Sequence, residues 1–226
     1  MREARVPQDL LSGLNGPLEP IRARLSFGTE QRLVVPSTQL LRGDALSTLM
    51  QRYARRFEVE PDRYLVSIWS QKYLATVIIP IMALAMLGGR ALDAAIESTA
   101  VVLDEGGEPV ALRVPCSFAS DGKDTAASLL VSMHLAPFAE TLSGWSGLSR
   151  KVLWGNAAHY LEWIIRQFPG GETPIALPAP MTDSIRYVDE DGARVRRRKV
   201  CCLRDRVPGV EDCGSLCPER KTRTKT

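Results

Sequence analysis

Four of the five cysteines in this 226-residue chain lie within seventeen positions near its C-terminal end. They are Cys201, Cys202, Cys213 and Cys217. The ten residues between the second and the third are enough for a loop that doubles back, and Pro208-Gly209 supplies a turn within it. Four thiols with this spacing can converge on one point, so the segment predicts a metal site.

Three interpretations compete for these cysteines. Two disulfides are disfavoured, because no apolar signal segment follows Met1 and structural disulfides are rare in the reducing compartment that this predicts. Structural zinc usually takes two well-separated Cys-x2-4-Cys pairs, whereas Cys201 and Cys202 have no spacer. A [2Fe–2S] cluster gives each of two adjacent thiolates its own iron. The spacing therefore favours iron–sulfur over zinc and leaves both open.

The cysteine pattern resembles the C-terminal tail of the ferric-siderophore reductase family (FhuF-like), Cys-Cys-x10-Cys-x2-Cys. This chain departs from it in one place, because Cys213 and Cys217 are separated by three residues instead of two. Upstream, Trp154 and Asn156 are similar to the family's Trp-x-Asn helix start, and residues 71–80 resemble its long apolar helix. The resemblance covers residues 60–218, and the cysteines are its most specific part.

The resemblance implies a [2Fe–2S] cofactor held by Cys201, Cys202, Cys213 and Cys217. It also implies a cytoplasmic enzyme, at most peripheral to the inner face of the membrane, that reduces Fe(III) in a ferric siderophore of hydroxamate type and so releases Fe(II). Neither G-x-G-x-x-G after a strand nor G-x-x-x-x-G-K-[ST] occurs, so electrons must come from an external one-electron donor such as a ferredoxin or a flavin reductase. Two alternatives remain: a zinc-stabilised helical binding module, and an accessory protein of siderophore biosynthesis without reductase activity.

Candidate substrate contacts lie on the last long helix and in the basic run before the cysteines. Asn156, His159 and Trp163 recur at helical spacing and form a polar–aromatic stripe. They can line a cavity for a large polar ligand or serve as ordinary interface and surface residues. Arg197 belongs to the run Arg196–Lys199, which offers positive charge to an anionic cluster or a docking patch to an acidic electron carrier.

Composition sets limits on the other classes of function. With 45% hydrophobic and 24% charged residues, the chain suits one or two globular domains, and its formal net charge of +3 gives no indication of nucleic-acid binding. The apolar stretch Tyr73–Gly89 is shorter than the roughly twenty residues that cross a bilayer. We expect a helix buried in a core and no transmembrane segment.

The expected fold class is α+β and mostly α, with a helical core, two short β-hairpins and a C-terminal iron–sulfur loop. The predicted domains are residues 1–180, a hairpin with the cysteine segment over 181–218, and a basic tail over 219–226. Cys116, alone among apolar neighbours, is expected to be a small buried side chain. Apolar periodicity and turn signals predict helices over 18–25, 44–57, 61–88, 123–142 with a break or bend at Pro137, and 148–168, and hairpins over 99–114 and 185–196.

Overall fold

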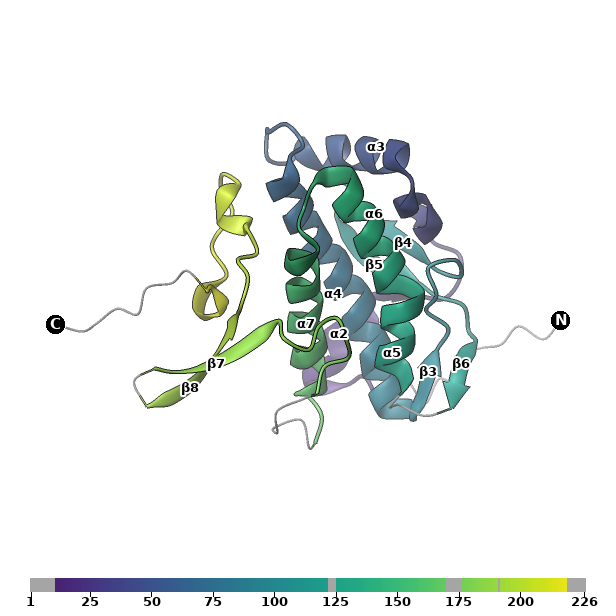
Figure 1. Ribbon diagram of the computed structural model, residues 1–226. Coiled ribbons are helices and arrows are strands. Elements are labelled where there is room, and N and C mark those ends of the chain that lie inside the picture. The colour runs from purple at the N-terminus through teal and green to yellow at the C-terminus, as the bar shows by residue number, and fades with distance from the viewer. Residues whose placement is uncertain (1–10, 122–124, 170–175, 191, 219–226) are drawn as a thin grey trace.

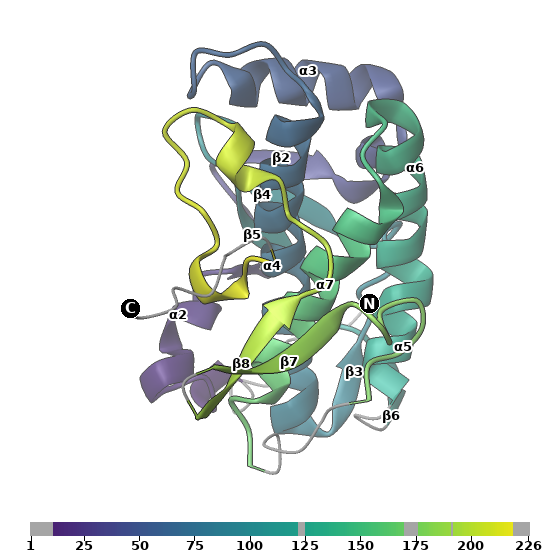
Figure 2. The ribbon, with the colours of Figure 1, turned by 60° about the vertical axis from the view of Figure 1, so that its left-hand side comes forward.

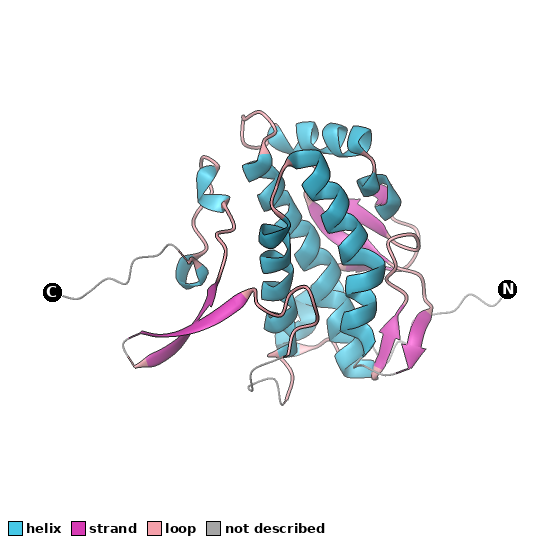
Figure 3. Ribbon diagram, viewed as in Figure 1, coloured by secondary structure: helices cyan, strands magenta, loops and turns pink. Residues whose placement is uncertain are grey.

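The computed structural model describes residues 11–121, 125–169, 176–190 and 192–218. It is an α+β structure dominated by helices, with short sheets on one side and an isolated β-hairpin on the other (Figure 3). The helices are α2 (Glu19–Arg22), α3 (Gly43–Ala54), α4 (Arg63–Gly88), α5 (Ala126–Leu130), α6 (Ala136–Ser146) and α7 (Arg150–Ile165). The strands are β1 (Leu25–Ser26), β2 (Leu33–Pro36), β3 (Arg90–Leu92), β4 (Ala100–Leu103), β5 (Pro109–Arg113), β6 (Phe118–Asp121), β7 (Ile185–Glu190) and β8 (Ala193–Arg198).

Helix α4 forms the centre of the core. Asp62 caps its N-terminus by accepting hydrogen bonds from the backbone N–H groups of Tyr64 and Leu65, and Gly89 ends it in the left-handed conformation with φ +65°. It has apolar side chains all round, because α7 packs on one side and β3 and β5 pack on others (Figure 1).

This helix meets the length and composition of a membrane span, but 78% of its most apolar window is buried inside the protein. That burial is what a central core helix requires, and it agrees with the expectation drawn from the sequence. Within it, Trp69 stacks on Tyr73 with ring centroids 5.5 Å apart, and Tyr73 packs on Phe138 of α6 at 4.4 Å.

The segment around Pro137 is helical, as predicted, but the helix has a wider, π-helical turn before the proline. Residues Val131–Leu135 form a π-helical turn between α5 and α6, and Pro137 stands in the first turn of α6. Because proline has no N–H, Pro137 cannot donate a helical hydrogen bond to the carbonyl of Met133, four residues earlier. It accepts instead a 3.0 Å hydrogen bond from the backbone N–H of Ile96.

Beside this turn, His134 is fully buried in the core. Its Nδ1 lies 2.8 Å from the Ala94 carbonyl oxygen and its Nε2 lies 2.6 Å from the Tyr73 hydroxyl. Nδ1–H therefore donates to the carbonyl and Nε2 accepts from the hydroxyl, which is the neutral imidazole. Burial lowers the pKa of His134 to about 4, so this histidine is a core residue.

The first predicted hairpin is confirmed as β4 and β5, which form the middle of a four-stranded sheet ordered β1-β5-β4-β2. Gly107 in its turn has φ +84°, and its carbonyl accepts a 2.9 Å hydrogen bond from the Trp69 indole. The sequence did not predict β1 and β2, nor the pair β3–β6. The predicted helix over 18–25 is shorter than expected, since α2 ends at Arg22 and β1 begins at Leu25.

The second predicted hairpin is confirmed as β7 and β8, with Ile185 opposite Arg198 and Glu190 opposite Ala193. Asp191 of its predicted turn lies outside the described residues, and so does the tail 219–226. The hairpin and the segment after it lie on the α7 side of the molecule (Figures 1 and 2). Two 3₁₀ turns follow β8, η5 (Arg204–Arg206) and η6 (Gly214–Leu216), and they contact α4 and β8 respectively. The division into domains at residue 180 stays a prediction.

Candidate metal centre

The four clustered cysteines lie on a loop that leaves the end of β8 and doubles back past α4. Leu203 takes the left-handed conformation with φ 62°, which turns the chain immediately after the adjacent pair, and Gly209 and Gly214 turn it again. Ser67 on α4 holds the start of this loop, because its hydroxyl donates a 2.7 Å hydrogen bond to the Cys202 carbonyl. The returning turn η6 packs against β8.

All five cysteines are reduced, and Cys202 is buried while Cys201, Cys213 and Cys217 are partly exposed. The Cys213 thiol donates a hydrogen bond to the Cys202 sulfur, and this donor lowers the pKa of Cys202 to about 6 against the opposing effect of burial. The same contact, with burial, raises the pKa of Cys213. The Cys201 sulfur accepts the backbone N–H of Leu203 at 3.4 Å. The loop thus already favours one thiolate, the form that binds metal.

Within the described part of the chain, no three side chains of His, Cys, Asp or Glu meet closely enough to hold a single metal ion. A structural zinc site needs four ligands on one ion, whereas a [2Fe–2S] cluster needs only two thiolates on each iron. The contact between Cys202 and Cys213 supplies such a pair, and Cys217 lies close enough to raise the pKa of Cys213 further. Reduced thiols on one loop, two of them in contact, fit a two-iron centre, in which each iron needs two thiolates.

Positive charge surrounds the buried sulfur. Arg198 from β8 and Arg204 from η5 both favour the Cys202 thiolate. The same two guanidinium groups and that of Arg24 act on the hydroxyl of Tyr160 on α7, whose pKa is nevertheless raised by burial. Basic side chains from β8 and η5 therefore come together beside Cys202, where they would offset the negative charge of a cluster.

The basic run Arg196–Lys199 does not form the free docking patch that the sequence suggested. Arg197 and Arg198 are only 7% and 2% exposed. Residues alternate between the two faces of a strand, so Arg196 and Arg198 face α7 while Arg197 faces away and pairs with Glu190. Only the end of β8 is covered in this way, where Arg196 and Arg198 contact α7 and the turn η6 packs against the strand.

A buried carboxylate on α7, Glu162, was not predicted as a functional residue. It is 3% exposed, forms an ion pair with Arg196, and accepts hydrogen bonds from Arg166 and the Tyr187 hydroxyl. These contacts fasten the β7–β8 hairpin to α7. The signal in the sequence is a lone acid four residues after Ala158, on the apolar face of its helix, followed by the arginine run.

The four predicted substrate residues have different surroundings. Asn156 is fully buried and accepts a hydrogen bond from Arg198, and Arg197 is buried, so neither side chain is on the surface. His159 is partly exposed, and its Nδ1 accepts from Arg196 at 2.9 Å, while Trp163 is 38% exposed. Burial and the two neighbouring arginines lower the pKa of His159 to about 3, which keeps it neutral. A substrate role stays a prediction for all four residues, and burial weighs against direct contact for two of them.

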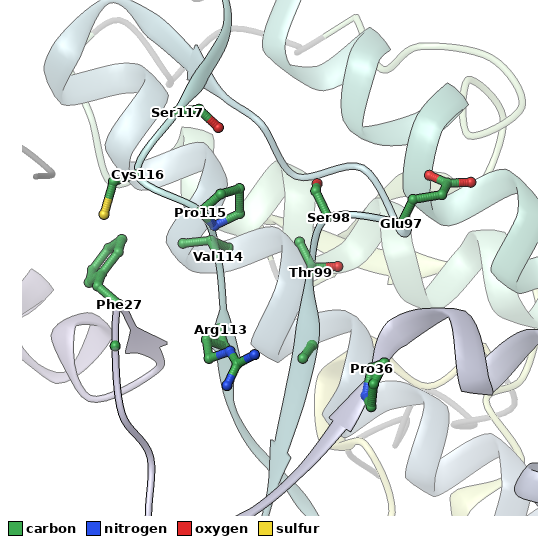
Figure 4. A pocket seen from close by; sticks show the side chains of 12 residues that line it. Phe27, Pro36, Glu97, Ser98, Thr99, Arg113, Val114, Pro115, Cys116 and Ser117 are labelled. Atoms are coloured by element: carbon green, nitrogen blue, oxygen red, sulfur yellow. The ribbon is translucent and has the colours of Figure 1, made fainter. Parts of the chain in front are cut away.

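The fifth cysteine, Cys116, is partly exposed rather than buried as predicted. It lines an open groove of about 880 Å³ beside the ends of β4 and β5, where its sulfur lies near Phe27 (Figure 4). Glu97, Thr99 and Arg113 also line this groove, and no residue of the C-terminal segment does. Cys116 is therefore separate from the four clustered thiols.

Comparison with known proteins gives this arrangement a context. A family model described as "Ferric iron reductase FhuF-like transporter" matches residues 67–188, more than half of the chain. The chain belongs to the FhuF-like family. A second model, described as "FhuF 2Fe-2S C-terminal domain", matches residues 198–218, which contain all four clustered cysteines.

The family of ferric-siderophore reductases inferred from the cysteine pattern is thus confirmed, and so is the [2Fe–2S] cofactor. A curated relative, the ferric siderophore reductase of Escherichia coli (strain K12), is 25% identical over 182 residues, which cover 69% of this chain and 66% of that protein. The match therefore spans slightly less than two thirds of the relative's length.

Proposed function

We propose that this chain reduces Fe(III) to Fe(II) in ferric siderophores, with Cys201, Cys202, Cys213 and Cys217 as the ligands of its [2Fe–2S] cluster. The observation that carries the proposal is the reduced, partly buried contact between Cys202 and Cys213 inside the segment that matches the 2Fe-2S domain. A [2Fe–2S] cluster takes up and gives out one electron at a time, which is the stoichiometry of the Fe(III)/Fe(II) couple.

Reduction would release the metal because Fe(III) and Fe(II) differ in their affinity for siderophore ligands. Siderophores offer hard oxygen donors that suit Fe(III), and Fe(II) binds the same donors far less tightly. One electron added to the complex therefore weakens its hold on the metal. We propose that the electron comes from an external ferredoxin or flavin reductase, and that iron is released in the cytoplasm.

The protein's own part is to hold the cluster near the surface and to position the substrate. Three of the four thiols are partly exposed, so a ferric complex can approach the cluster edge without entering the core. In the predicted polar–aromatic stripe on α7, Trp163 is exposed and His159 is partly exposed, and we propose both as contacts of the bound complex. We propose a hydroxamate siderophore as the substrate.

The test is an anaerobic purification followed by visible absorption and EPR spectra before and after dithionite. We expect a brown protein whose reduced cluster is reoxidised by a ferric hydroxamate, with Fe(II) trapped by a ferrous chelator in a one-to-one ratio with the electrons lost. A parallel reaction with a ferric catecholate tests the substrate class.

Cysteine variants test the ligand assignment in the same assay. Cys202→Ser should lose or destabilise the cluster, and Cys116→Ser is the matched control that should leave the spectrum unchanged. A colourless wild-type protein that contains zinc would refute the cluster. A brown protein that no ferric siderophore reoxidises would point to an accessory role in siderophore biosynthesis.

A further inference from the structure

Three consecutive arginines at the end of β8 have different kinds of partner. Arg196 pairs with the carboxylate of Glu162, and Arg197 pairs with the carboxylate of Glu190. Arg198 instead donates from Nη1 to the side-chain oxygen of Asn156, a neutral amide. Two of the three positive charges are neutralised, and that of Arg198 has no carboxylate partner among the described residues.

Both members of the Arg198–Asn156 pair are buried. Arg198 is 2% exposed and Asn156 is fully buried, so water neutralises this charge very little. A buried arginine is ordinarily paired with an acid, because an uncompensated charge in the interior is costly. The arrangement therefore suggests that a negative charge absent from the polypeptide belongs beside Arg198.

The position of Arg198 shows where that negative charge would lie. The residue ends β8 three positions before Cys201, and the turn η6, which lies between Cys213 and Cys217, packs against β8. A [2Fe–2S] cluster on four thiolates is anionic and becomes more so when it is reduced.

Several of the buried hydrogen-bond donors without a partner belong to Arg198, to its partner Asn156 and to Arg204. Nε of Arg198, Nε of Arg204 and Nδ2 of Asn156 are buried and have no acceptor among the residues that the structure describes. A buried N–H left without a partner costs about 1–3 kcal/mol, so three of them together call for an acceptor. Cluster and cysteine sulfurs accept N–H hydrogen bonds, and such bonds raise the reduction potential of iron–sulfur centres.

We propose that Asn156 is a positioning residue that holds Arg198 against the cluster, so that an unneutralised buried charge and its free N–H groups stabilise the reduced state. This inference rests on the proposed function, because it requires the four cysteines to bind the cluster. A neutral amide suits this role. It orients the guanidinium group through one acceptor and does not cancel the charge, as a carboxylate would.

The decisive variant is Asn156→Asp, which keeps the side-chain size and the acceptor oxygen but adds a negative charge. Its measurement is the midpoint potential of the cluster, followed by EPR in an anaerobic redox titration at matched iron content. At a fixed ambient potential we expect the ratio of reduced to oxidised cluster to fall at least tenfold, which is about 59 mV for a one-electron couple.

Two further variants separate charge from position. Arg198→Gln removes the charge and should lower the potential in the same direction as Asn156→Asp. Arg206→Gln is the matched control, because it removes an exposed arginine of the same segment, and it should change the ratio far less. The effect of Asn156→Asp should also persist at roughly 1 M salt, where the Debye length is about 3 Å and exposed charges are screened.

The outcomes separate this inference from the function on which it rests. If Asn156→Asp and Arg198→Gln load the cluster and titrate like the wild type, the positioning role is wrong while the reductase proposal stands. If Asn156→Asp fails to fold, Arg198→Gln against Arg206→Gln decides the question alone. If the wild-type protein binds no cluster, both proposals fall together.

Discussion

The hydroxyl of Ser67, near the N-terminal end of the core helix α4, donates a 2.7 Å hydrogen bond to the carbonyl oxygen of Cys202. The two residues are 135 positions apart in the sequence, and Ser67 is fully buried. This bond joins the buried central helix to the one cysteine of the loop that is buried. The helix therefore fixes the depth at which Cys202 is held.

Replacing Ser67 with alanine should loosen the cluster. The Cys202 carbonyl would be left buried without its donor, at a cost of about 1–3 kcal/mol. We expect Ser67→Ala to take up the cluster and to lose it faster in air, measured as the rate at which visible absorption bleaches.

The matched control for that variant is Ser70→Ala. Ser70 is equally buried on the same helix, but its hydroxyl bonds to the Ser67 carbonyl within the helix. Its removal should leave the bleaching rate near that of the wild type. Equal rates in the two variants would show that the bond to Cys202 does not hold the cluster loop.

Glu162→Gln should detach the β7–β8 hairpin from α7. The carboxylate is 4% exposed at its side chain and faces Arg196 and Arg166, so its loss leaves two partly buried cations without their counter-charge. Breaking a buried pair costs about 3–5 kcal/mol, and the partial exposure of both arginines places the effect near the lower end. Urea unfolding monitored by circular dichroism measures it.

Glu140→Gln provides the comparison for a surface pair. Glu140 and Arg150 form an ion pair whose side chains are 69% and 60% exposed, and such pairs contribute at most about 1 kcal/mol. A loss of stability in Glu140→Gln as large as that in Glu162→Gln would mean that burial of the carboxylate is not what gives the network its strength.

The parts of the fold that the sequence predicted are those specified by neighbouring residues. The central helix has a capping Asp62, a continuous apolar run and a terminal Gly89, and both long hairpins have glycine in their turns. Strands such as β1 and β3 have two or three residues each and pair with segments far along the chain. Too few residues carry a pattern in such strands, so only the tertiary structure defines them.

The candidate site, like the fold, has a part that the sequence predicts and a part that only the tertiary structure defines. Spacing alone predicts a metal centre at the four cysteines, since such a centre needs several ligands within a short reach, and their role as ligands stays a proposal. The arginine run was interpreted as a surface, because charged residues in sequence are usually solvated. Which arginine meets Glu162 and which meets Asn156 depends on how β8 lies across α7, and periodicity within either element does not encode that geometry.

The stop of the central helix can be tested with a pair of adjacent glycines. Gly89 has φ +65° and donates to the Ala85 carbonyl at 2.9 Å, so Gly89→Ala would force an L side chain into the left-handed region at about 1–2 kcal/mol. Gly88 lies inside the helix, where Gly88→Ala should be neutral or should stabilise by up to about 1 kcal/mol. In thermal unfolding we expect the midpoint temperature to fall for Gly89→Ala and to stay the same or rise for Gly88→Ala. An equal loss of stability in the two variants would contradict the assignment of Gly89 as the cap.

The stability of the core should decrease as the pH falls through the range where unfolded histidine titrates. Burial lowers the pKa of His134 from an ordinary 6.5 to about 4 in the folded protein, so between these values the unfolded state takes up a proton that the native state refuses. The contribution of the neutral His134 to the free energy of unfolding is intact above pH 6.5. It is lost progressively as the pH falls to 4, by about 3 kcal/mol in all.

The His134→Gln variant isolates this effect, because it removes the titrating ring and keeps a side chain that can both donate and accept. It should be less stable than the wild type at pH 7, since the contacts to Tyr73 and Ala94 are disturbed, and its stability should fall less between pH 7 and pH 4. Free energies of unfolding in urea at several pH values give the two curves. His159→Gln is the comparison: burial and two arginines lower the pKa of His159 to about 3, so its contribution to stability should be lost in the same direction as the pH falls. Parallel curves for the wild type and His134→Gln would show that His134 is protonated equally in both states, and the neutral core histidine would then be wrong.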